Sequence, residues 1–385
     1  MKVLHTSDLH IGKKLEGRER LEEQKQVLEE IFDIIVSNEI ELIICAGDIF
    51  DTYNPSAEAE QLFFEYAKKF ASDGRAFVII SGNHDDNKRL IATVPLSQEL
   101  NIFIVGNQKQ FFKGCKSNNL HLIESGEGYL IFENNCNEKI FINTLPYPSE
   151  YRFKEENKNE DYITQMQRWL NNGHDKNVNK YPEILISHIF TLGGIISSSE
   201  REIDLGGAKA FPPKLLPKCD YVALGHLHKF QKVAENVYYS GSIMQYAFDE
   251  AGLDKFVITF DISDSINGNR INNFEKHCLK NIKRLARLSA NSVLQAEALL
   301  AVNSNSYIEL TLYTDKPLSH FEYKELTAKY PDIVSIITVI NEEKTNKESR
   351  KNFNKKEMFV AYYQHKFQKE PSKELLDLYL ELMEA

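Results

Sequence analysis

Side chains that can bind metal ions stand directly after five apolar, β-branched runs of the sequence. The runs end in Asp8-Leu9-His10, Gly47-Asp48, Gly82-Asn83-His84, Ser187-His188 and Gly225-His226-Leu227-His228. Loops at the carboxyl ends of strands gather on one edge of an α/β sheet, so residues far apart in sequence can meet there. The five segments therefore predict one site, and their glycines allow the backbone to turn sharply beside it.

The chemistry of these side chains points to a pair of divalent ions. Carboxylate, amide oxygen and imidazole suit borderline ions such as manganese, iron or zinc. The set exceeds what one ion normally takes, and Asp48, in its middle, could bridge two ions about 3.5–4 Å apart, the spacing used on phosphate esters. The predicted metal ligands are Asp8, His10, Asp48, Asn83, His188, His226 and His228.

Strands and helices alternate in the part of the chain that carries these segments. Apolar runs and helical patterns predict a βαβαβ order over residues 2–81, with helices at 19–38 and 56–72. A hairpin-rich β stretch is expected at 118–144, an exposed loop at 154–160 and a helix at 161–171. Further strands are expected at 184–187, 221–224, 237–240 and 255–260. In the first helix, one apolar face is expected to pack on the sheet, formed by Val27, Leu28, Ile31, Phe32 and Ile35.

A length of 385 residues suggests two or three domains, at about 150 residues each. The chain turns polar over 261–273, beyond which strands at 307–313 and 333–340 and a helix at 319–330 predict a small α+β unit. The charged stretch 341–356 marks a second boundary, followed by one or two helices over 357–385. The expected domains are therefore 1–272, 273–342 and 343–385.

Composition limits the classes of function. A formal net charge of −10 argues mildly against a protein that coats nucleic acid with a broad basic surface, but cations or a partner can supply positive charge to a nuclease. No apolar run approaches the roughly 20 residues of a membrane span, and the first residues lack a signal-peptide pattern, so we expect a cytoplasmic protein. Five scattered cysteines predict reduced thiols, with Cys45 and Cys219 buried.

Taken in order, the five segments resemble the sequence blocks of the calcineurin-like metallophosphoesterases. The longer runs 47–52 and 188–194, followed by Ser199-Glu200-Arg201, resemble more narrowly the bacterial nuclease subunits of that superfamily that work with a coiled-coil ATPase. The blocks span residues 1 to about 260, and the remainder matches in layout more than in motif. The resemblance implies an α/β fold, a two-sheet metallophosphoesterase sandwich flanked by helices, with a small α+β capping domain and a C-terminal helical segment.

The resemblance also implies roles for individual residues. One ion would be held by Asp8, His10, Asp48 and His228, and the other by Asp48, Asn83, His188 and His226. His84 matches the family's non-ligand histidine, which faces the scissile phosphate and stabilises the transition state or protonates the leaving oxygen. The alternative for His84 is that it orients the metal ligands from behind.

The implied function is a manganese-dependent DNA exonuclease and endonuclease acting on ends or hairpins in DNA repair and recombination. Its implied partners are DNA and the ATPase subunit, with a homodimer inside a heterotetramer. A phosphodiesterase or phosphatase on a small or protein substrate is the alternative enzyme, and a non-catalytic scaffold is the alternative outside enzymes. The residues after the core favour the nuclease, because a small-substrate enzyme needs no second domain or docking tail.

Several other residues and clusters in the sequence each fit two interpretations. Asp51 and Asp85 either orient a metal-bound histidine or cap a helix, and Glu200 and Arg201 either serve the site or form a structural ion pair. A basic cluster is either a solvated face or a DNA-backbone contact; it comprises Lys276, Lys280, Lys283, Arg284 and Arg287. An apolar stripe near the end either packs on its own domain or docks on a partner. It comprises Leu375, Leu376, Leu378, Tyr379, Leu382 and Met383.

Overall fold

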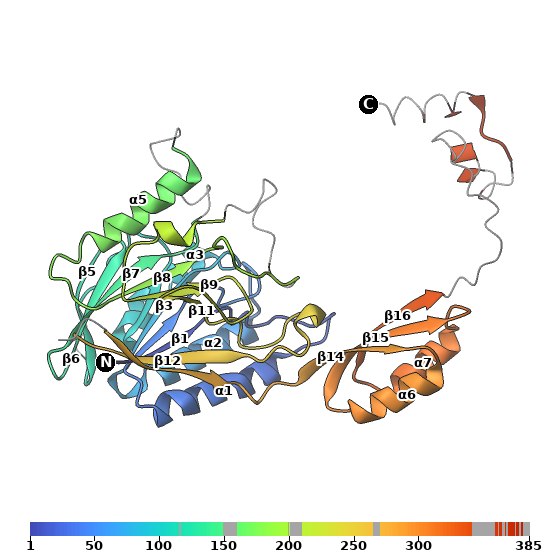
Figure 1. Cartoon of the computed structure of the whole chain (residues 1–385), viewed down its shortest axis with the longest axis horizontal. Helices are drawn as coiled ribbons and strands as arrows, with labels where there is room; N and C mark the ends of the chain where they lie inside the picture. The colour runs from blue at the N-terminus through green and yellow to red at the C-terminus, as the bar shows by residue number, and fades with distance from the viewer. Residues whose placement is uncertain are drawn as a thin grey trace.

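The computed structural model describes residues 1–114, 117–148, 160–198, 200, 210–264 and 270–340. Near the carboxyl end it describes 359–360, 362–363, 366, 369–373, 375–376 and 379. Two β-sheets face each other in the larger part of the molecule, and helices cover their outer faces (Figure 1). This arrangement is the α/β sandwich that the sequence predicts.

The first sheet has six strands in the order β13-β12-β1-β2-β3-β4. Its parallel strands are β1 (Lys2–Thr6), β2 (Leu42–Cys45), β3 (Ala76–Ile80) and β4 (Ile102–Val105), and β12 (Phe256–Ile262) and β13 (Ile271–Cys278) extend it antiparallel. Every residue of β2 and β3 is buried, as expected for parallel strands covered on both faces. The carboxyl ends of β1, β2 and β3 therefore lie side by side.

Helices α1 (Leu21–Ser37) and α2 (Ala57–Phe70) cover the outer face of this sheet. The buried face of α1 consists of Gln24, Val27, Leu28, Ile31 and Ile35, so four of the five residues expected to face the sheet are buried. Ser56 caps α2 by accepting a hydrogen bond from the Ala59 amide. Two short helices follow β3, namely α3 (Asn87–Ile91) and α4 (Val94–Ser97).

The second sheet has seven strands in the order β10-β11-β9-β8-β7-β6-β5. The strands are β5 (Leu120–Gly126), β6 (Tyr129–Asn134), β7 (Lys139–Leu145), β8 (Glu183–His188), β9 (Tyr221–Gly225), β10 (Gln231–Ala234) and β11 (Val237–Tyr239). In β8, Ile184 and Ile186 belong to the core between the sheets, whereas Leu185 packs with Met166 and Leu170 of α5 (Tyr162–His174). The layers are therefore helices, sheet, sheet and helix.

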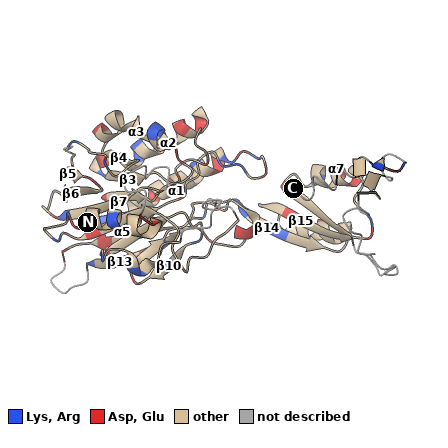
Figure 2. Ribbon diagram, turned by 90° about the horizontal axis from the view of Figure 1, so that it is seen from above, with Lys and Arg blue, Asp and Glu red and all other residues tan. Residues whose placement is uncertain are grey.

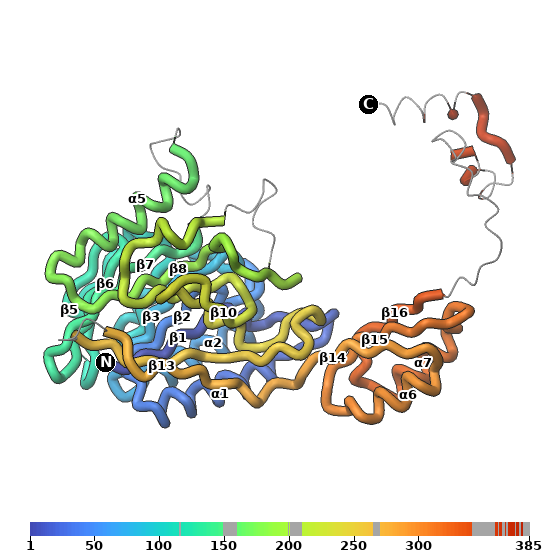
Figure 3. The backbone as a smooth tube through the Cα atoms, viewed as in Figure 1, coloured from blue at the N-terminus to red at the C-terminus, as the bar shows by residue number. Residues whose placement is uncertain are grey.

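A smaller unit lies beside the sandwich (Figures 1 and 3). It contains β14 (Arg284–Ala290), α6 (Val293–Val302), β15 (Ser306–Thr314), α7 (His320–Lys329) and β16 (Ile333–Ile340). Its three strands are parallel, and a capping box between Ser319 and Glu322 begins α7. The division expected between residues 272 and 273 falls inside β13, which stays paired with β12 as far as Cys278.

Some expected features lie outside the described residues, among them Ser199, Arg201, most of 154–160 and all of 341–356. Cys45 and Cys219 are buried as predicted, with 0% and 5% of their surface exposed. Across the described residues, no helix combines the length and apolar character that a membrane crossing requires.

Candidate metal centre

The seven predicted ligands meet at the carboxyl ends of five strands. Asp8 and His10 follow β1, Asp48 follows β2 and Asn83 follows β3, while His188 ends β8 and His226 and His228 follow β9. All seven side chains are buried, with at most 6% of any residue exposed. The structure therefore brings the whole predicted set together between the two sheets.

Hydrogen bonds tie these loops to one another. The amide of Asp8 donates to Gly47 O and the amide of His10 to Asp48 O, both at 3.0 Å. The amide of His226 donates to Asp8 Oδ1 at 3.0 Å, which joins the second sheet to the first. Gln24 of α1 holds the loop after β1 by donating from Nε2 to His10 O at 2.8 Å. Each loop is thus positioned by its neighbours.

Four of the seven residues have the left-handed backbone conformation that L side chains rarely adopt. The φ angles are 52° at Asp8, 41° at His10, 51° at Asp48 and 106° at His226. Such conformations cost about 1–3 kcal/mol each and persist where surrounding contacts enforce them, most often at functional sites. The backbone is therefore held in an unfavourable shape where the polar side chains converge.

One half of the centre is formed by Asp8, His10 and His228. One ligand atom from each residue lies within 4.8 Å of the other two. The Nε2 atoms of His10 and His228 are 3.0 Å apart, and His228 Nδ1 lies 3.3 Å from Glu250 Oε1 on the side away from His10. Both Nε2 atoms therefore face the same point.

The other half is formed by Asn83, His188 and His226. Asn83 Oδ1 lies 2.9 Å from His188 Nε2 and 3.1 Å from His226 Nδ1. His188 Nδ1 donates to Ala46 O at 2.7 Å, which leaves Nε2 directed into the centre. An amide oxygen and two imidazole nitrogens thus converge as a second donor set.

Asp48 lies between the two halves. Its Oδ2 is 3.6 Å from His10 Nε2 and 3.4 Å from His188 Nε2, and its Oδ1 accepts from the His84 amide at 2.8 Å. The same carboxylate therefore borders both donor sets, as a bridging ligand must.

The electrostatics of the centre favour bound cations. Burial, together with the charge of Asp48, raises the pKa of Asp8 to about 8. Burial also opposes ionisation of Asp48, but the charge and hydrogen bond of His188 outweigh it and hold that pKa well below its usual range. Burial acts against protonation of His188 too, yet Asp48 raises the pKa of that ring to about 9. Buried carboxylates that draw a proton onto an imidazole provide a place for divalent cations, which supply the same positive charge.

The other imidazoles are held neutral, the form that ligates metals. Burial lowers the pKa of His10 to about 4. Burial and the charge of His188 lower the pKa of His226 well below its usual range, and burial also lowers that of His228. The donor set therefore fits divalent ions in both geometry and charge.

His84 lies beside the centre but is oriented differently from the seven. Its Nδ1 donates to the backbone oxygen of Asp51 at 2.6 Å, and its ring meets His10 edge to face at 4.6 Å between centroids. With Nδ1 engaged by the backbone, Nε2 is the nitrogen that would serve a substrate. One His84 nitrogen also lies within 4.8 Å of ligand atoms of His10 and Asp48, so this residue borders the donor set.

Asp51 and Asp85 support the centre, and neither caps the following helix. Asp85 accepts from the amides of Ile49, Phe50 and Gly82, which fixes the loops after β2 and β3. Asp86 is the residue that caps α3. Asp51 Oδ1 lies 2.6 Å from Lys13 Nζ and 3.5 Å from His10 Nδ1. The contacts of Asp51 therefore support the orienting interpretation, whereas those of Asp85 fix the backbone of two loops.

Three further groups hold the loop that carries His228. Glu200 accepts from the His228 amide at 2.7 Å and so helps to hold this loop, while the ion pair expected with Arg201 lies outside the described residues. Glu250 lies behind the His228 ring, and the buried Lys255 ammonium donates to Glu250 and to His228 O. No sequence motif links Glu250 or Lys255 to His228, so only the tertiary structure reveals these two.

The basic cluster is largely engaged by acidic side chains. Lys283 pairs with Asp332 at 2.5 Å, Arg284 with Asp254 at 2.8 Å and Arg287 with Glu309 at 2.7 Å. Lys276 lies over the Phe230 ring at 4.5 Å. These contacts are those of an ion-paired surface, and the DNA-backbone contact stays a prediction.

Comparisons with known proteins agree with the chemistry of the site. The profile of the calcineurin-like phosphoesterase family matches residues 1–230. The SbcD component of the SbcCD nuclease of Bacillus subtilis (strain 168) is 32% identical over 99% of this chain and 97% of its own length. A crystal structure of a dimetal phosphatase from Danio rerio superposes with a TM-score of 0.40 at 9% identity, covering 73% of this chain and 99% of that one.

Two findings establish the family: the profile matches more than half of the chain, and the Bacillus subtilis relative is similar over nearly the full length of both chains. The buried donor set supplies the chemistry of that family. The chain therefore belongs to the calcineurin-like phosphoesterases, as a relative of the SbcD nuclease subunit, and is a metal-dependent phosphodiesterase.

Proposed function

We propose that the protein is a two-metal, manganese-dependent DNA nuclease that works with an SbcC-type coiled-coil ATPase at DNA ends or hairpins. The observation that carries this proposal is the extent of the similarity to SbcD. The phosphoesterase profile ends at residue 230, whereas the similarity to the Bacillus nuclease covers 99% of the chain. A small-substrate phosphoesterase would share the core alone.

The proposed reaction divides the work between the ions and the protein. When bound, two divalent ions would shield the phosphate charge and lower the pKa of the attacking water. We assign one ion to Asp8, His10, Asp48 and His228, and the other to Asp48, Asn83, His188 and His226. His84 Nε2 would donate to the phosphate or to the leaving oxygen, because its Nδ1 is engaged by Asp51 O.

A cavity beside the centre gives a substrate room to approach the metal ligands. A cavity of about 750 Å³ is lined in part by Lys13, Lys14 and Asp51, and Asp51 borders His10. Both lysines are ion-paired there, Lys13 with Asp51 and Lys14 with Glu19, so the cavity lining offers little free positive charge. Elsewhere in the described residues, basic and acidic side chains are interspersed (Figure 2). Positive charge for DNA would then come from the ions and the partner.

We assign partner binding to the parts outside the sandwich. The small unit, within the expected domain 273–342, would act as the capping and DNA-contacting domain, and residues 343–385 would bind the ATPase. In that segment, Leu375 and Tyr362 expose 36% and 57% of their surface. A homodimer within a heterotetramer completes the proposal, on the strength of the family resemblance.

A substrate panel tests the proposed function. Purified protein is given manganese or magnesium with a DNA hairpin, a linear duplex or a chromogenic phosphodiester, with and without the ATPase subunit. We expect cleavage of DNA in manganese and much slower cleavage in magnesium, which prefers an all-oxygen octahedral shell. Hydrolysis of the chromogenic ester with every DNA left intact, even with the partner present, would favour the small-substrate alternative.

A further inference from the structure

A second cluster of metal-binding side chains lies at the opposite end of the strands that carry His188 and His226. His174 is the last residue of α5, Glu183 begins β8, and Cys219 precedes β9. One ligand atom from each lies within 4.8 Å of the other two. Glu183 Oε2 is 2.8 Å from His174 Nδ1, and Glu183 Oε1 is 3.3 Å from Cys219 Sγ.

This cluster is separate from the catalytic centre. Glu183 and His188 are the first and last residues of the six-residue strand β8. At roughly 3.3 Å per residue they are about 16 Å apart along the strand. No residue of this cluster takes part in the phosphodiesterase chemistry described above.

The carboxylate at the middle of the cluster is buried without a permanent cation. Glu183 is 3% exposed, and nowhere in the described ranges does a lysine or arginine form an ion pair with it. Its hydrogen-bonding neighbours are His174, Cys219, Asn177 and Asn143. A buried carboxylate is costly unless it is paired or coordinates a metal.

Asn143 of β7 packs beside the cluster. Asn143 is fully buried, and its Nδ2 lies 3.5 Å from Glu183 Oε1. Its Oδ1 has no hydrogen-bond partner within the described structure. Gly173 allows α5 to approach this amide, because a Cβ at that position would overlap Asn143 Oδ1. The amide that approaches Glu183 through Nδ2 thus keeps an unsatisfied buried oxygen against Gly173, the residue before His174.

We propose that Cys219, Glu183 and His174 form a zinc-binding site. Thiolate, imidazole and carboxylate are the usual protein ligands of zinc, and three of them leave one position for water. His174 is one-third exposed, so solvent reaches that side of the cluster. The thiol selects zinc over manganese, since sulfur ligands favour the softer ion.

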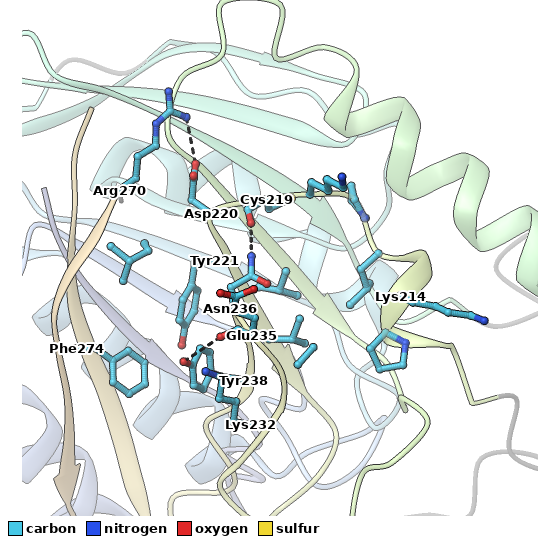
Figure 4. Close-up of a pocket in the computed structure, with 18 residues that line it drawn as sticks. Lys214, Cys219, Asp220, Tyr221, Lys232, Glu235, Asn236, Tyr238, Arg270 and Phe274 are labelled. Carbon is cyan, nitrogen blue, oxygen red and sulfur yellow. Dashed lines mark hydrogen bonds and ion pairs between the residues drawn. The ribbon is translucent and has the colours of Figure 1, made fainter. Parts of the chain in front are cut away.

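Binding exchanges a proton for the ion. In the metal-free protein the Cys219 thiol donates a hydrogen bond to Glu183. When zinc binds, the S–H bond breaks, the proton leaves to solvent, and a sulfur–zinc bond forms. Cys219 also lines a cavity of about 740 Å³ together with Asp220, Tyr221 and Arg270 (Figure 4), which offers the ion a route inward. The bound ion would fasten the end of α5 to the start of β8 and to the segment leading into β9.

Cobalt(II) provides a probe that separates this site from the catalytic centre. Cobalt bound to a thiolate gives a charge-transfer absorption in the near ultraviolet, and no cysteine belongs to the catalytic donor set. Metal-free full-length protein is titrated with cobalt and then with zinc, alongside Cys219→Ser, His174→Gln and the exposed-cysteine control Cys136→Ser. We expect the band in the native protein and in Cys136→Ser, its loss in Cys219→Ser, and at least a tenfold weaker affinity in His174→Gln.

Zinc should abolish the cobalt band and raise the thermal midpoint of the native protein but not of Cys219→Ser. If Cys219→Ser fails to fold, His174→Gln carries the test, because its side chain reaches the surface. The proposal is overturned if the native protein shows no thiolate band. It is equally overturned if the band survives in Cys219→Ser or if His174→Gln binds cobalt as tightly as the native protein.

Discussion

Glu250 Oε1 lies 3.3 Å from Nδ1 of His228, and the other oxygen of Glu250 accepts a hydrogen bond from the Lys255 ammonium. Glu250 and Lys255 are 0% and 2% exposed. A carboxylate behind an imidazole fixes the ring orientation and directs its other nitrogen toward the metal. Glu250 is therefore a positioning residue for the metal centre.

Replacing this carboxylate should weaken metal binding. We expect Glu250→Gln to reduce manganese affinity by about 10- to 100-fold, the usual effect of losing such a partner. The variant also leaves Lys255 buried without its partner, a loss of about 3–5 kcal/mol in the free energy of unfolding. Calorimetric titration with manganese and chemical denaturation measure the two effects separately.

The double variant Glu250→Gln with Lys255→Met distinguishes orientation from general destabilisation. It should recover part of the stability while its manganese affinity stays low. If affinity returns together with stability, Glu250 acts on the fold and has no part in orienting His228.

A methyl group at Gly82 should disturb the centre directly. A Cβ built there overlaps Asp48, both its carboxylate and its backbone nitrogen. We therefore expect Gly82→Ala to weaken manganese affinity at least as much as Glu250→Gln does, by about 10- to 100-fold or more. Gly252→Ala is the control. A Cβ at Gly252 meets nothing within 4 Å, so this substitution strains the backbone, which has a positive φ there, without causing a steric overlap. Equal manganese binding by both variants would refute the close packing of Gly82 on Asp48.

His84 should act on substrate and leave the ions in place. We expect His84→Gln to bind manganese as the native protein does while the cleavage rate falls by about 10²–10⁴-fold, the usual contribution of a positioned acid or base. His320→Gln, at the exposed start of α7, is the matched control. Parallel loss of manganese in His84→Gln would show that this histidine is a ligand.

Strands and helices with strong local signals are predictable from the sequence. The strand expected at 333–340 matches β16, and Ser56, Asp161 and Ser319 cap the helices expected after them. Helix α6 is not predicted, because its residues are almost all apolar or small and no polar face marks a helix. Strand β14 is not predicted either, since Arg284 and Arg287 are three residues apart, out of step with the period of two that marks a half-buried strand.

The candidate site is predictable from the sequence for a different reason. Its predicted ligands each follow a strand, and parallel strands bring such positions together whatever their separation in the chain. Glu250 and Lys255 lie in irregular structure around a short turn, so no periodic pattern connects them to His228. Likewise His174, Glu183 and Cys219 are single residues on three elements, without the paired spacing that marks a zinc motif.

The carboxyl-terminal segment should be dispensable for the metal centre. In its described part, the Phe359 ring stacks on Tyr379 at 4.1 Å. We expect deletion of the residues after 356 to leave manganese binding and partner-independent cleavage nearly unchanged but to disrupt the complex with the ATPase subunit. Each leucine buried in that interface would contribute about 1.5–3 kcal/mol to the free energy of binding, and the deletion removes these contributions.

Size-exclusion chromatography with the ATPase subunit measures the complex, and manganese titration serves as the internal control. Unfolding or loss of manganese in the truncated protein would place the segment in the core. Unchanged binding to the ATPase would remove the docking role.

The number of manganese ions bound per chain in Asp48→Ala tests the central claim most directly. Asp48 Oδ2 lies between His10 and His188, so one substitution removes a shared ligand from both halves of the centre. Equilibrium dialysis should find about two manganese ions per native chain and none in a folded Asp48→Ala variant at the same free concentration. Retention of one ion or both by Asp48→Ala would contradict a two-metal centre bridged by this carboxylate.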